Sequence, residues 1–334
     1  MQNSNMIARL PALAAMEYEL KTTKRWLHKL RIRVIAAGLL ASVLSLQGCA
    51  TTDLRTPLEV RSFFIPEASA VPLAASGHST LRVMTLNVAH GRGEAFHQLL
   101  QKSGTIVQNL DQISAMLKRE QPDVVALQEA DAPSFWSGNF HHVDYLARQA
   151  SFSSAVNGAH VDGPGLAYGT ALLANTDLRY AESVTFNPDL ALTPKGFVIS
   201  TIEWPGQPHV QVDVVSLHLD FASESTRRQQ ALELIAFLCD RNRPMIVMGD
   251  FNADWAASDA TVRLIASELS LHAYDPRGKG QNTFPYRDKR LDWILVSSEL
   301  EFREYQVVSD ALSDHRGVIA ELELGTRLVK NVLQ

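Results

Sequence analysis

Several carboxylate, amide and imidazole side chains stand at the ends of apolar runs in this 334-residue sequence. Asn87 ends the run LRVMTLN, Glu129 follows DVVALQ, and Asp250 follows PMIVMG. The other members of this set are His218, Asn252, Asp292, Asp314 and His315. Polar groups at strand ends commonly converge on one rim of a sheet. We therefore expect these side chains to form one site.

The chemistry of this set is that of metal-assisted hydrolysis. Carboxylate and amide oxygens without paired cysteines suit a hard cation such as Mg²⁺ or Mn²⁺. Two histidines can donate to phosphate oxygens or move protons near neutral pH. Cleavage of a phosphodiester requires a metal that polarises the phosphoryl group, an oriented water and an acid for the leaving oxygen. The set supplies groups for each of these tasks.

The elements that must position these residues follow from periodicity. Helical spacing of apolar residues predicts a helix over 106–119, which Pro122 ends, and another from Ser225 or Thr226 to about Asp240. Residues 259–270 also look helical. Strands are expected over 81–87, 123–128, 170–174, 198–203, 210–219, 244–249, 291–296, 302–308 and 317–324. Because helices are absent between the strands of the 166–220 region, this order favours two packed sheets flanked by helices over a doubly wound fold.

The first fifty residues differ from the rest. A basic stretch precedes an apolar run from Val34 to Leu46, which is followed by Leu46-Gln47-Gly48-Cys49. The apolar run is too short to span a bilayer, which needs about 20 residues. This end resembles a bacterial lipoprotein signal, in which Cys49 carries lipid; a plain signal peptide or an uncleaved anchor is the alternative. Ala50 after the cysteine then favours the periplasmic face of the outer membrane.

Charge also changes at this boundary. Seven of the 31 basic side chains but only two of the 36 acidic ones precede Cys49, which leaves a net charge of −10 after it. An acidic body disfavours nonspecific binding of nucleic acid, since such binding depends on Lys and Arg. Cys239 stands in a helical apolar pattern, and we expect a buried, inert thiol there.

Six short motifs occur in the order typical of one superfamily. They are Thr85-Leu86-Asn87, Leu127-Gln128-Glu129, Leu217-His218-Leu219, Gly249-Asp250-Phe251-Asn252, Arg290-Leu291-Asp292 and Ser313-Asp314-His315. Over residues 80–325 the sequence resembles the endonuclease/exonuclease/phosphatase superfamily. The resemblance implies an α/β fold, a four-layer sandwich in which two mostly antiparallel β-sheets pack face to face between helices. We expect a signal peptide over 1–49, a linker over 50–79, the catalytic domain over 80–326 and a tail over 327–334.

The resemblance also implies roles. Glu129 is expected to be the principal metal ligand, with Asn87 beside it and Asp314 as a further carboxylate of the metal site. The implied cofactor is Mg²⁺, with Mn²⁺ as the alternative. From the residues alone, the alternatives are a strand-end turn at Asn87, a turn cap or a surface pair at Glu129, and a cap only at Asp314.

The expected catalytic residues are carried over in the same way. Asp250 would orient or deprotonate the attacking water, and Asn252 would hold that water or a phosphate oxygen. His315 would stabilise the phosphoryl charge, with Asp292 fixing its tautomer, while His218 would bind phosphate or protonate the leaving oxygen. The alternative, purely structural roles are an Asx turn at Asp250 and Asn252, an ion pair between Asp292 and His315, and a hydrogen-bonded core histidine at His218.

Departures and local matches bear on the substrate. Thr170 stands where many relatives carry an amide, and we expect it to contact substrate. Lys195 stands where relatives often have an arginine, and we give it no role. The stretch His90-Gly91-Arg92-Gly93 resembles bacterial members grouped with lipid-remodelling phosphodiesterases. Arg92 is expected to bind an anionic substrate, with a solvated loop residue as the alternative. Trp136 lies in a loop that could line the substrate pocket.

The leading expectation is a monomeric, envelope-anchored phosphodiesterase acting on a lipid headgroup or small phosphoester. A tethered nuclease is the first alternative, and its best basic candidates are Arg227-Arg228 and the group Arg287, Lys289 and Arg290. A non-catalytic scaffold lipoprotein is the second alternative.

Overall fold

The computed structural model describes residues 55–63, 80–188, 191, 193–258 and 261–325, all within the compact unit Thr52–Gln334. The expected signal, Cys49 and the tail at 327–334 lie outside the described residues. Within the described part, no helix is both long and apolar enough to cross a bilayer.

Two seven-stranded sheets form the body of this unit. The first has the order β1 (Arg55–Pro57), β7 (Arg179–Thr185), β8 (Gly196–Trp204), β9 (Gln207–His218), β10 (Met245–Asp250), β12 (Asp292–Ser297) and β11 (Leu271–Ala273). The second has the order β13 (Leu300–Val307), β14 (Val318–Leu324), β3 (Thr80–Asn87), β4 (Val124–Asp131), β6 (Leu166–Ala174), β5 (Ser154–Gly163) and β2 (Arg61–Ser62). Only β3 with β4 and β9 with β10 pair in parallel among the described strands, so both sheets are mostly antiparallel, as expected.

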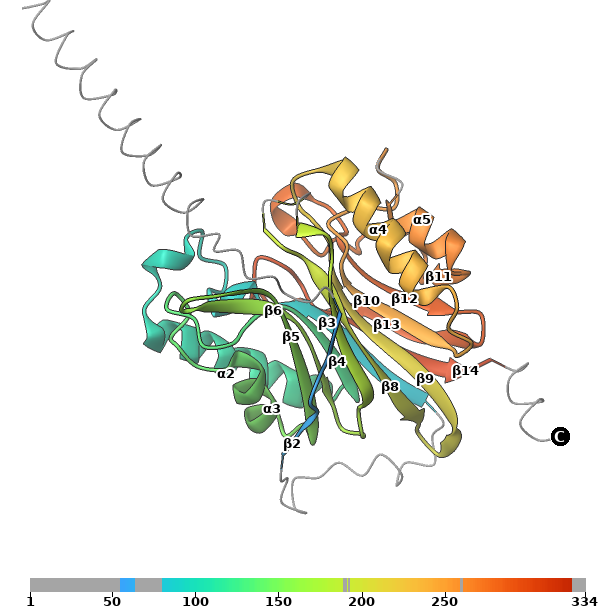
Figure 1. Ribbon diagram of the computed structural model, residues 1–334, viewed down its shortest axis with the longest axis horizontal. Helices are drawn as coiled ribbons and strands as arrows, with labels where there is room; N and C mark the ends of the chain where they lie inside the picture. The colour runs from blue at the N-terminus through green and yellow to red at the C-terminus, as the bar shows by residue number, and fades with distance from the viewer. Residues whose placement is uncertain (1–54, 64–79, 189–190, 192, 259–260, 326–334) are drawn as a thin grey trace, which may run out of the picture. The chain divides into compact units, whose positions relative to one another are not determined.

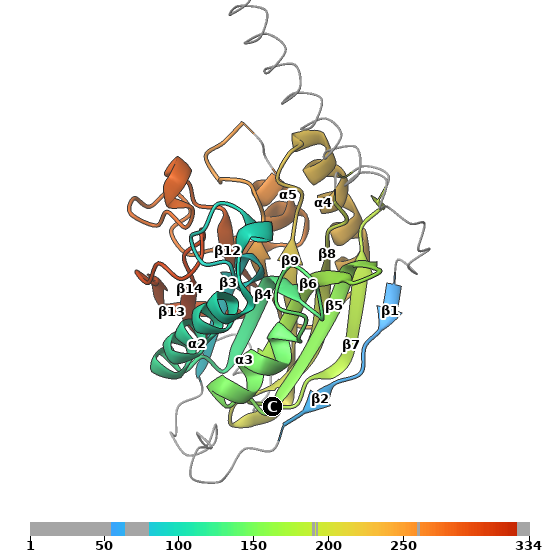
Figure 2. The ribbon, with the colours of Figure 1, turned by 90° about the vertical axis from the view of Figure 1, so that its left-hand side faces the viewer.

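Helices cover the outer faces of both sheets. Helices α2 (Ser103–Glu120) and α3 (His142–Ala150) lie on the second sheet, and α4 (Glu224–Leu238) and α5 (Thr261–Glu268) lie on the first (Figures 1 and 2). Helix α2 connects β3 to β4, and α4 connects β9 to β10, because a parallel pair needs a long crossover. The four-layer sandwich is therefore confirmed.

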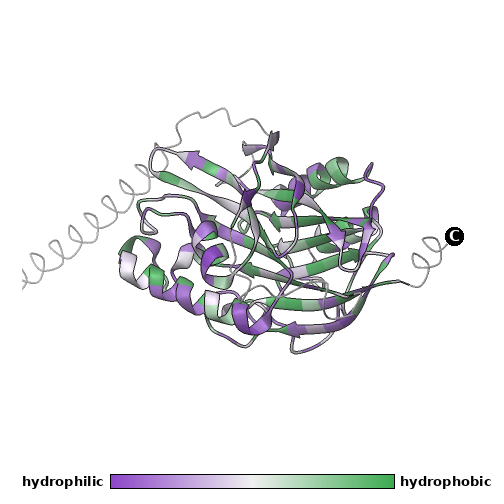
Figure 3. Cartoon of the chain, turned by 90° about the horizontal axis from the view of Figure 1, so that it is seen from below, coloured by the Kyte–Doolittle hydropathy of each residue, from purple (hydrophilic) through white to green (hydrophobic). Residues whose placement is uncertain are grey.

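Alternation along the central strands explains why apolar runs were visible in the sequence. In β4, Val124 and Ala126 face the other sheet, whereas Val125 and Leu127 face α2 and α3. Burial on both faces demands apolar residues at every position, so the period-two pattern disappears. The strands between the helical layers accordingly carry long hydrophobic stretches (Figure 3).

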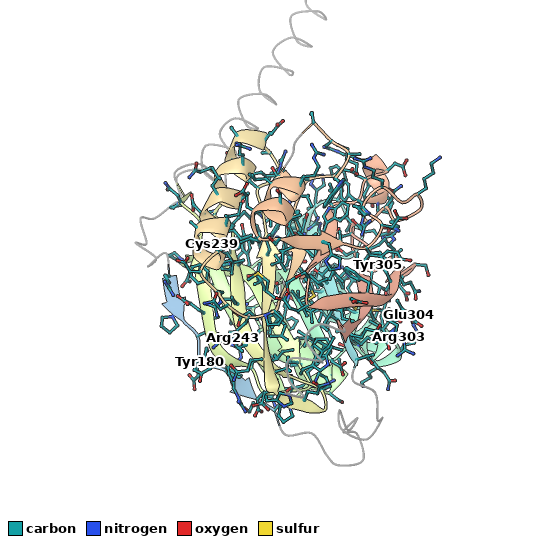
Figure 4. The ribbon with its side chains drawn as sticks, turned by 90° about the vertical axis from the view of Figure 1, so that its right-hand side faces the viewer. Tyr180, Cys239, Arg243, Arg303, Glu304 and Tyr305 are labelled. Atoms are coloured by element: carbon teal, nitrogen blue, oxygen red, sulfur yellow. The ribbon has the colours of Figure 1, made fainter. Side chains whose placement is uncertain are left out.

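Three expectations from the sequence are corrected. Residues 55–63 are not a plain linker, because β1 pairs with β7 and β2 pairs with β5 at the sheet edges. Helix α4 is capped by Ser223, whose Oγ accepts from the backbone N–H of Thr226. Cys239 is exposed, because it lies at the C-cap of α4 past the buried stripe of that helix (Figure 4).

Candidate active site

The parallel pair in the second sheet delivers two site residues to one edge. Asn87, the last residue of β3, lies opposite Gln128 of β4. The next residue, Glu129, sits at an irregularity in the pairing of β4 with β6 and has a left-handed φ of 51°. This irregularity turns the Glu129 side chain out of the regular alternation of the strand.

Strand register in the first sheet places three more site residues side by side. Asp250 at the end of β10 pairs with His218 of β9 on one side and with Asp292 of β12 on the other. Gly196, the first residue of β8, lies opposite His218, which brings the preceding Lys195 to the same edge. The sheet therefore aligns an imidazole and two carboxylates, with an ammonium group beside them.

Gly249 makes this alignment possible. A Cβ atom at this position would stand 1.9 Å from the backbone oxygen of Leu217 in the neighbouring strand. Only glycine therefore allows β10 to lie against β9 just before Asp250.

Asp250 is the meeting point of the two sheets. It is 1% exposed, and its Oδ2 accepts from Asn87 Nδ2 at 3.1 Å. The same oxygen lies 3.5 Å from His218 Nε2 and 3.6 Å from His315 Nε2. Burial, reinforced by the nearby Asp292 carboxylate and opposed by His315, raises the pKa of Asp250 to about 7. A carboxyl group with that pKa can exchange a proton near neutral pH.

His315 and Asp292 form a buried dyad. His315 Nδ1 donates to Asp292 Oδ2 at 2.8 Å, so Nε2 faces Asp250. Burial opposes the charged imidazole, but the Asp292 and Asp250 carboxylates outweigh it and raise the pKa of His315 to about 10. Thr283 holds β12 in place, since its Oγ1 accepts from the backbone N–H of Asp292.

Basic side chains surround Glu129. Its side chain is 19% exposed, and its Oε2 lies 3.3 Å from His90 Nε2 and 3.5 Å from the Arg92 guanidinium. Its other oxygen lies 4.0 Å from Lys195 Nζ. Burial would raise the pKa of Glu129, but His90, Lys195, His218 and Arg92 together hold it far below its usual value. The carboxylate is therefore ionised at every working pH.

Arg92 joins Asp314 to Glu129. The guanidinium donates to Asp314 Oδ2 as well as lying against Glu129. The structure thus brings Asp314 to the site through Arg92, and Arg92 is no free loop residue.

His218 and Lys195 share a buried corner. Lys195 Nζ lies 3.2 Å from Nε2 and 3.3 Å from Nδ1 of His218. Burial, and then the neighbouring ammonium, depress the pKa of His218 well below its usual value, and burial also depresses that of Lys195. His218 is therefore neutral at neutral pH and acts as a hydrogen-bonding group.

Asn252 and Thr170, which were expected to contact water or substrate, form hydrogen bonds within the chain. Asn252 donates from its backbone to Asp250 Oδ1 at 2.9 Å and from its side chain to the Leu219 oxygen at 3.0 Å, which is an Asx turn that aims Asp250. Thr170 is fully buried, and its Oγ1 lies 2.9 Å from His160 Nε2. The structure does not join Thr170 to the carboxylates, and its contact with substrate stays a prediction.

The donor atoms fit a divalent cation. Ligand atoms of Asp250, Asp292 and His315 lie within 4.8 Å of one another. Asp292 Oδ1 is buried without a hydrogen-bond partner, as expected of an oxygen that serves a cation. Glu129 and Asp314 supply two further carboxylates nearby. Oxygen donors of this kind suit Mg²⁺ or Mn²⁺.

The sequence did not reveal the roles of His90, Asp131 and Lys195 at this edge of the sheets. His90 reaches Glu129 and is held by Asp131, whose Oδ1 lies 2.6 Å from His90 Nδ1. The spacing of His90, Glu129 and Asp131 in the sequence does not indicate these contacts, because they depend on a left-handed turn at His90 that brings its ring back over β4. Lys195 had a visible signal, since it directly precedes a strand that pairs with the His218 strand.

Comparison with known proteins decides the family. The sequence profile of the endonuclease/exonuclease/phosphatase family matches residues 84–315. The chain belongs to this family. Its members include phosphatases, nucleases and phosphodiesterases, and the fold is that of hydrolases acting on phosphoester bonds. Members of this family typically depend on a divalent metal.

Solved structures share the family fold at low identity. A family protein from Bacteroides vulgatus is 20% identical, with a TM-score of 0.60, covering 74% of this chain and 99% of that one. The human nocturnin catalytic domain, with bound sulfate, is 18% identical, with a TM-score of 0.55 and coverages of 80% and 98%. A mannosyl-6-phosphatase from Bacteroides thetaiotaomicron is 18% identical, with a TM-score of 0.53 and coverages of 72% and 99%. A search of curated proteins gave no match.

Proposed function

We propose that the protein is a metal-dependent phosphodiesterase of the cell envelope, acting on a lipid headgroup or a small phosphoester. The observation that carries this proposal is the position of Asp250, a buried carboxylate within 3.6 Å of the His218 and His315 imidazoles and hydrogen-bonded to Asn87. A base, two donors and ligand oxygens lie together, as hydrolysis of a phosphoester requires.

Glu129 would hold the metal ion, with Asn87 and Asp314 as further ligands. When bound, the ion would polarise the phosphoryl group and neutralise charge that develops on its oxygens. Glu129 stays ionised at neutral pH, which a ligand carboxylate needs.

Asp250 would orient the attacking water and accept its proton. Its pKa of about 7 matches this task, because a base whose pKa is near the working pH is both available and strong enough. Asn87 and the Asx turn at Asn252 fix the two carboxylate oxygens.

The two histidines would act differently. His315, kept protonated by Asp292, would stabilise charge on the phosphoryl oxygens and could donate a proton to the leaving oxygen. His218 is neutral at neutral pH and would hold a phosphate oxygen by a hydrogen bond, beside Lys195.

An apolar rim supports a lipid substrate. We define it by the exposed residues Phe96, Leu99, Leu100, Phe135, Phe221 and Tyr286, six of the nine large hydrophobic side chains that are exposed in the described part. These residues follow β3, β4 and β9 or precede β12, and all four positions lie at the edge that carries the site. Exposed apolar surface next to a site marks a contact with a membrane or an apolar ligand.

Hydrogen bonds connect the loops of this rim. Tyr286 Oη donates to the Glu94 backbone oxygen at 3.3 Å. Gln98 Nε2 donates to the Trp136 oxygen at 3.0 Å. The loops after β3, after β4 and before β12 therefore hold one another in place, which suits a surface that docks as a unit.

Two of the five basic candidates for nucleic acid binding, Arg227 and Arg290, have partners within the chain. Arg290 is 4% exposed, stacks 3.9 Å from the Trp293 ring and donates to Tyr305 Oη. Arg227 donates to the Asp220 backbone oxygen. Together with the net charge of −10 after Cys49, these contacts favour a lipid or small ester over DNA or RNA.

The named neighbours agree with a phosphoester substrate. The nocturnin domain holds a sulfate anion, and the Bacteroides thetaiotaomicron protein is a mannosyl-6-phosphatase, whose name implies cleavage of a phosphate group. Both groups are tetrahedral oxyanions like the one proposed here. We further propose that Cys49 carries the lipid anchor of a monomer at the periplasmic face of the outer membrane.

The test is a substrate panel with the purified full chain, Mg²⁺ or Mn²⁺, and an EDTA control. The panel contains phospholipid vesicles, bis-p-nitrophenyl phosphate, inositol phosphates and supercoiled plasmid. EDTA-sensitive cleavage of lipid or small ester with intact plasmid supports the proposal. Rapid nicking of the plasmid would make the protein a nuclease instead.

A further inference from the structure

His90 lies in a turn that aims its ring at the site. Ala89, His90 and Gly91 have φ values of 47°, 54° and 73°, three consecutive left-handed residues that only Val88 separates from β3. The Ala89 N–H donates to Asn87 Oδ1 at 3.0 Å and fixes the start of the turn. L-residues rarely adopt this conformation, and clusters of it mark functional sites.

Asp131 fixes the orientation of the imidazole. It is fully buried, and its Oδ1 lies 2.6 Å from His90 Nδ1 while its Oδ2 accepts from Trp136 Nε1 at 2.8 Å. The Trp136 and Tyr168 rings pack against the imidazole, with centroids 5.0 Å and 4.7 Å away. Because a carboxylate can only accept, His90 carries a proton on Nδ1 and presents Nε2 to the site.

His90 Nε2 faces the oxygen that the proposed metal would use. It lies 3.3 Å from Glu129 Oε2. Two lone pairs face each other at this separation only with a cation between them, which is either a second proton on the ring or a metal ion. Neighbouring ligands about 2.1 Å from one ion are roughly 3 Å apart, close to the separation seen here.

The surroundings favour a metal ion at this place. Glu129, like His90, has a left-handed backbone, so both side chains are aimed by conformations that regular strand or helix would not give. Arg92 touches the same Glu129 oxygen and also pairs with Asp314, so both carboxylates already attract a cation. A carboxylate behind a ligating histidine is also the usual partner that orients it toward a metal.

We propose that His90 is a nitrogen ligand of the ion held by Glu129, and that Asp131 positions it. This inference rests on the metal-dependent function proposed above. A nitrogen ligand disfavours Mg²⁺ and suits a first-row transition ion, so the site would select Mn²⁺ over Mg²⁺.

The experiment uses Mn²⁺ as the probe and the full chain as the protein. Electron spin-echo envelope modulation detects ¹⁴N coupling from an imidazole bound directly to Mn²⁺. We expect this coupling in the wild type and in His315→Asn, and its loss in His90→Gln. Titration calorimetry should show weaker Mn²⁺ binding, by roughly 10–100-fold, in His90→Gln and in Asp131→Asn.

His315→Asn is the matched control, because His315 is the other imidazole in a cluster that could hold a metal. Coupling that disappears in His315→Asn and persists in His90→Gln would place the ion beside Asp250 and overturn the proposal. Absence of coupling in the wild type would do the same. If His90→Gln does not fold, as circular dichroism would show, unchanged Mn²⁺ affinity in Asp131→Asn would overturn it. The readout is ligation, so a protein that binds Mn²⁺ through His90 without cleaving phosphoesters would refute only the proposed function.

Discussion

His315 donates from Nδ1 to Asp292 Oδ2 at 2.8 Å, and the two residues come from opposite sheets. Asp292 begins β12 of the first sheet, and His315 precedes β14 of the second. The dyad exists only when the sandwich is assembled. The same contact sets the tautomer and the charge of His315, which makes Asp292 the natural place to begin testing the site.

Asp292→Asn should lower kcat by about 10²–10³-fold, because an uncharged partner no longer stabilises the imidazolium. Folding should persist, since the side chain keeps its size. The measurement is hydrolysis of bis-p-nitrophenyl phosphate together with circular dichroism. Asp310→Asn is the control, since Asp310 forms a surface pair with Arg119 and such pairs contribute little. Equal activity of both variants would show that the charge of Asp292 does not support His315 in the reaction.

The pH–rate profile should be bell-shaped. Asp250 works as its carboxylate, and burial raises its pKa to about 7, so kcat/KM should rise with pH up to about 7. His315 works protonated, so the rate should fall above about 10. Because Asp250 and His315 interact, the two apparent pKa values of the profile belong to the pair and not to either residue alone. Asp292→Asn removes a carboxylate that raises both pKa values, so both limbs should move to lower pH. An alkaline limb that stays in place would contradict this assignment.

Gly249→Ala should destabilise the protein by roughly 3 kcal/mol or more, because the added Cβ would meet the Leu217 backbone at 1.9 Å. Urea denaturation followed by circular dichroism measures this. Gly163→Ala is the control, since nothing lies within 4 Å of its added Cβ, and its effect should stay within about 0.5 kcal/mol. Similar stabilities of the two variants would show that β9 and β10 can separate at no cost.

The apolar rim should matter only for substrate presented in a membrane. Replacing Phe96, Leu100 and Phe135 by Ser should weaken vesicle binding by at least roughly 100-fold, because each inserted side chain contributes about 1.5–3 kcal/mol. Vesicle flotation measures this binding. Tyr180→Ser is the control, since Tyr180 is 73% exposed but stands away from the site edge, in β7 (Figure 4). Equal vesicle binding of the two variants would argue against a lipid substrate.

Much of the sandwich could be predicted because its central strands are buried on both faces. Runs such as DVVALQ and PMIVMG leave few alternatives to a buried strand, and the bounds of both were located within three residues. Strands β5 and β7 and helix α3 were missed. They are rich in small and polar residues, as in Ser154–Gly163, and lack a continuous apolar run.

The site was predicted where its residues end strands and was missed where loops fold back. His218 and Asp250 are neighbours because of strand register, and Asn87 at the end of β3 reaches Asp250 from the other sheet; a sequence pattern can indicate such strand ends. His90 and Asp131 meet through a left-handed turn and a strand irregularity, and no periodic signal encodes either. Metal identity and substrate class likewise depend on atoms that only the folded chain brings together.

Catalysis by Asp250 with a metal ion at Glu129 is tested most directly by hydrolysis of bis-p-nitrophenyl phosphate by the wild type, Asp250→Asn and Glu129→Gln. We expect turnover that EDTA abolishes and Mn²⁺ or Mg²⁺ restores, with kcat/KM lowered at least about 10²-fold in both variants. Asp310→Asn should match the wild type. Turnover that survives EDTA would contradict metal dependence, and turnover that survives both substitutions would contradict the roles of Asp250 and Glu129.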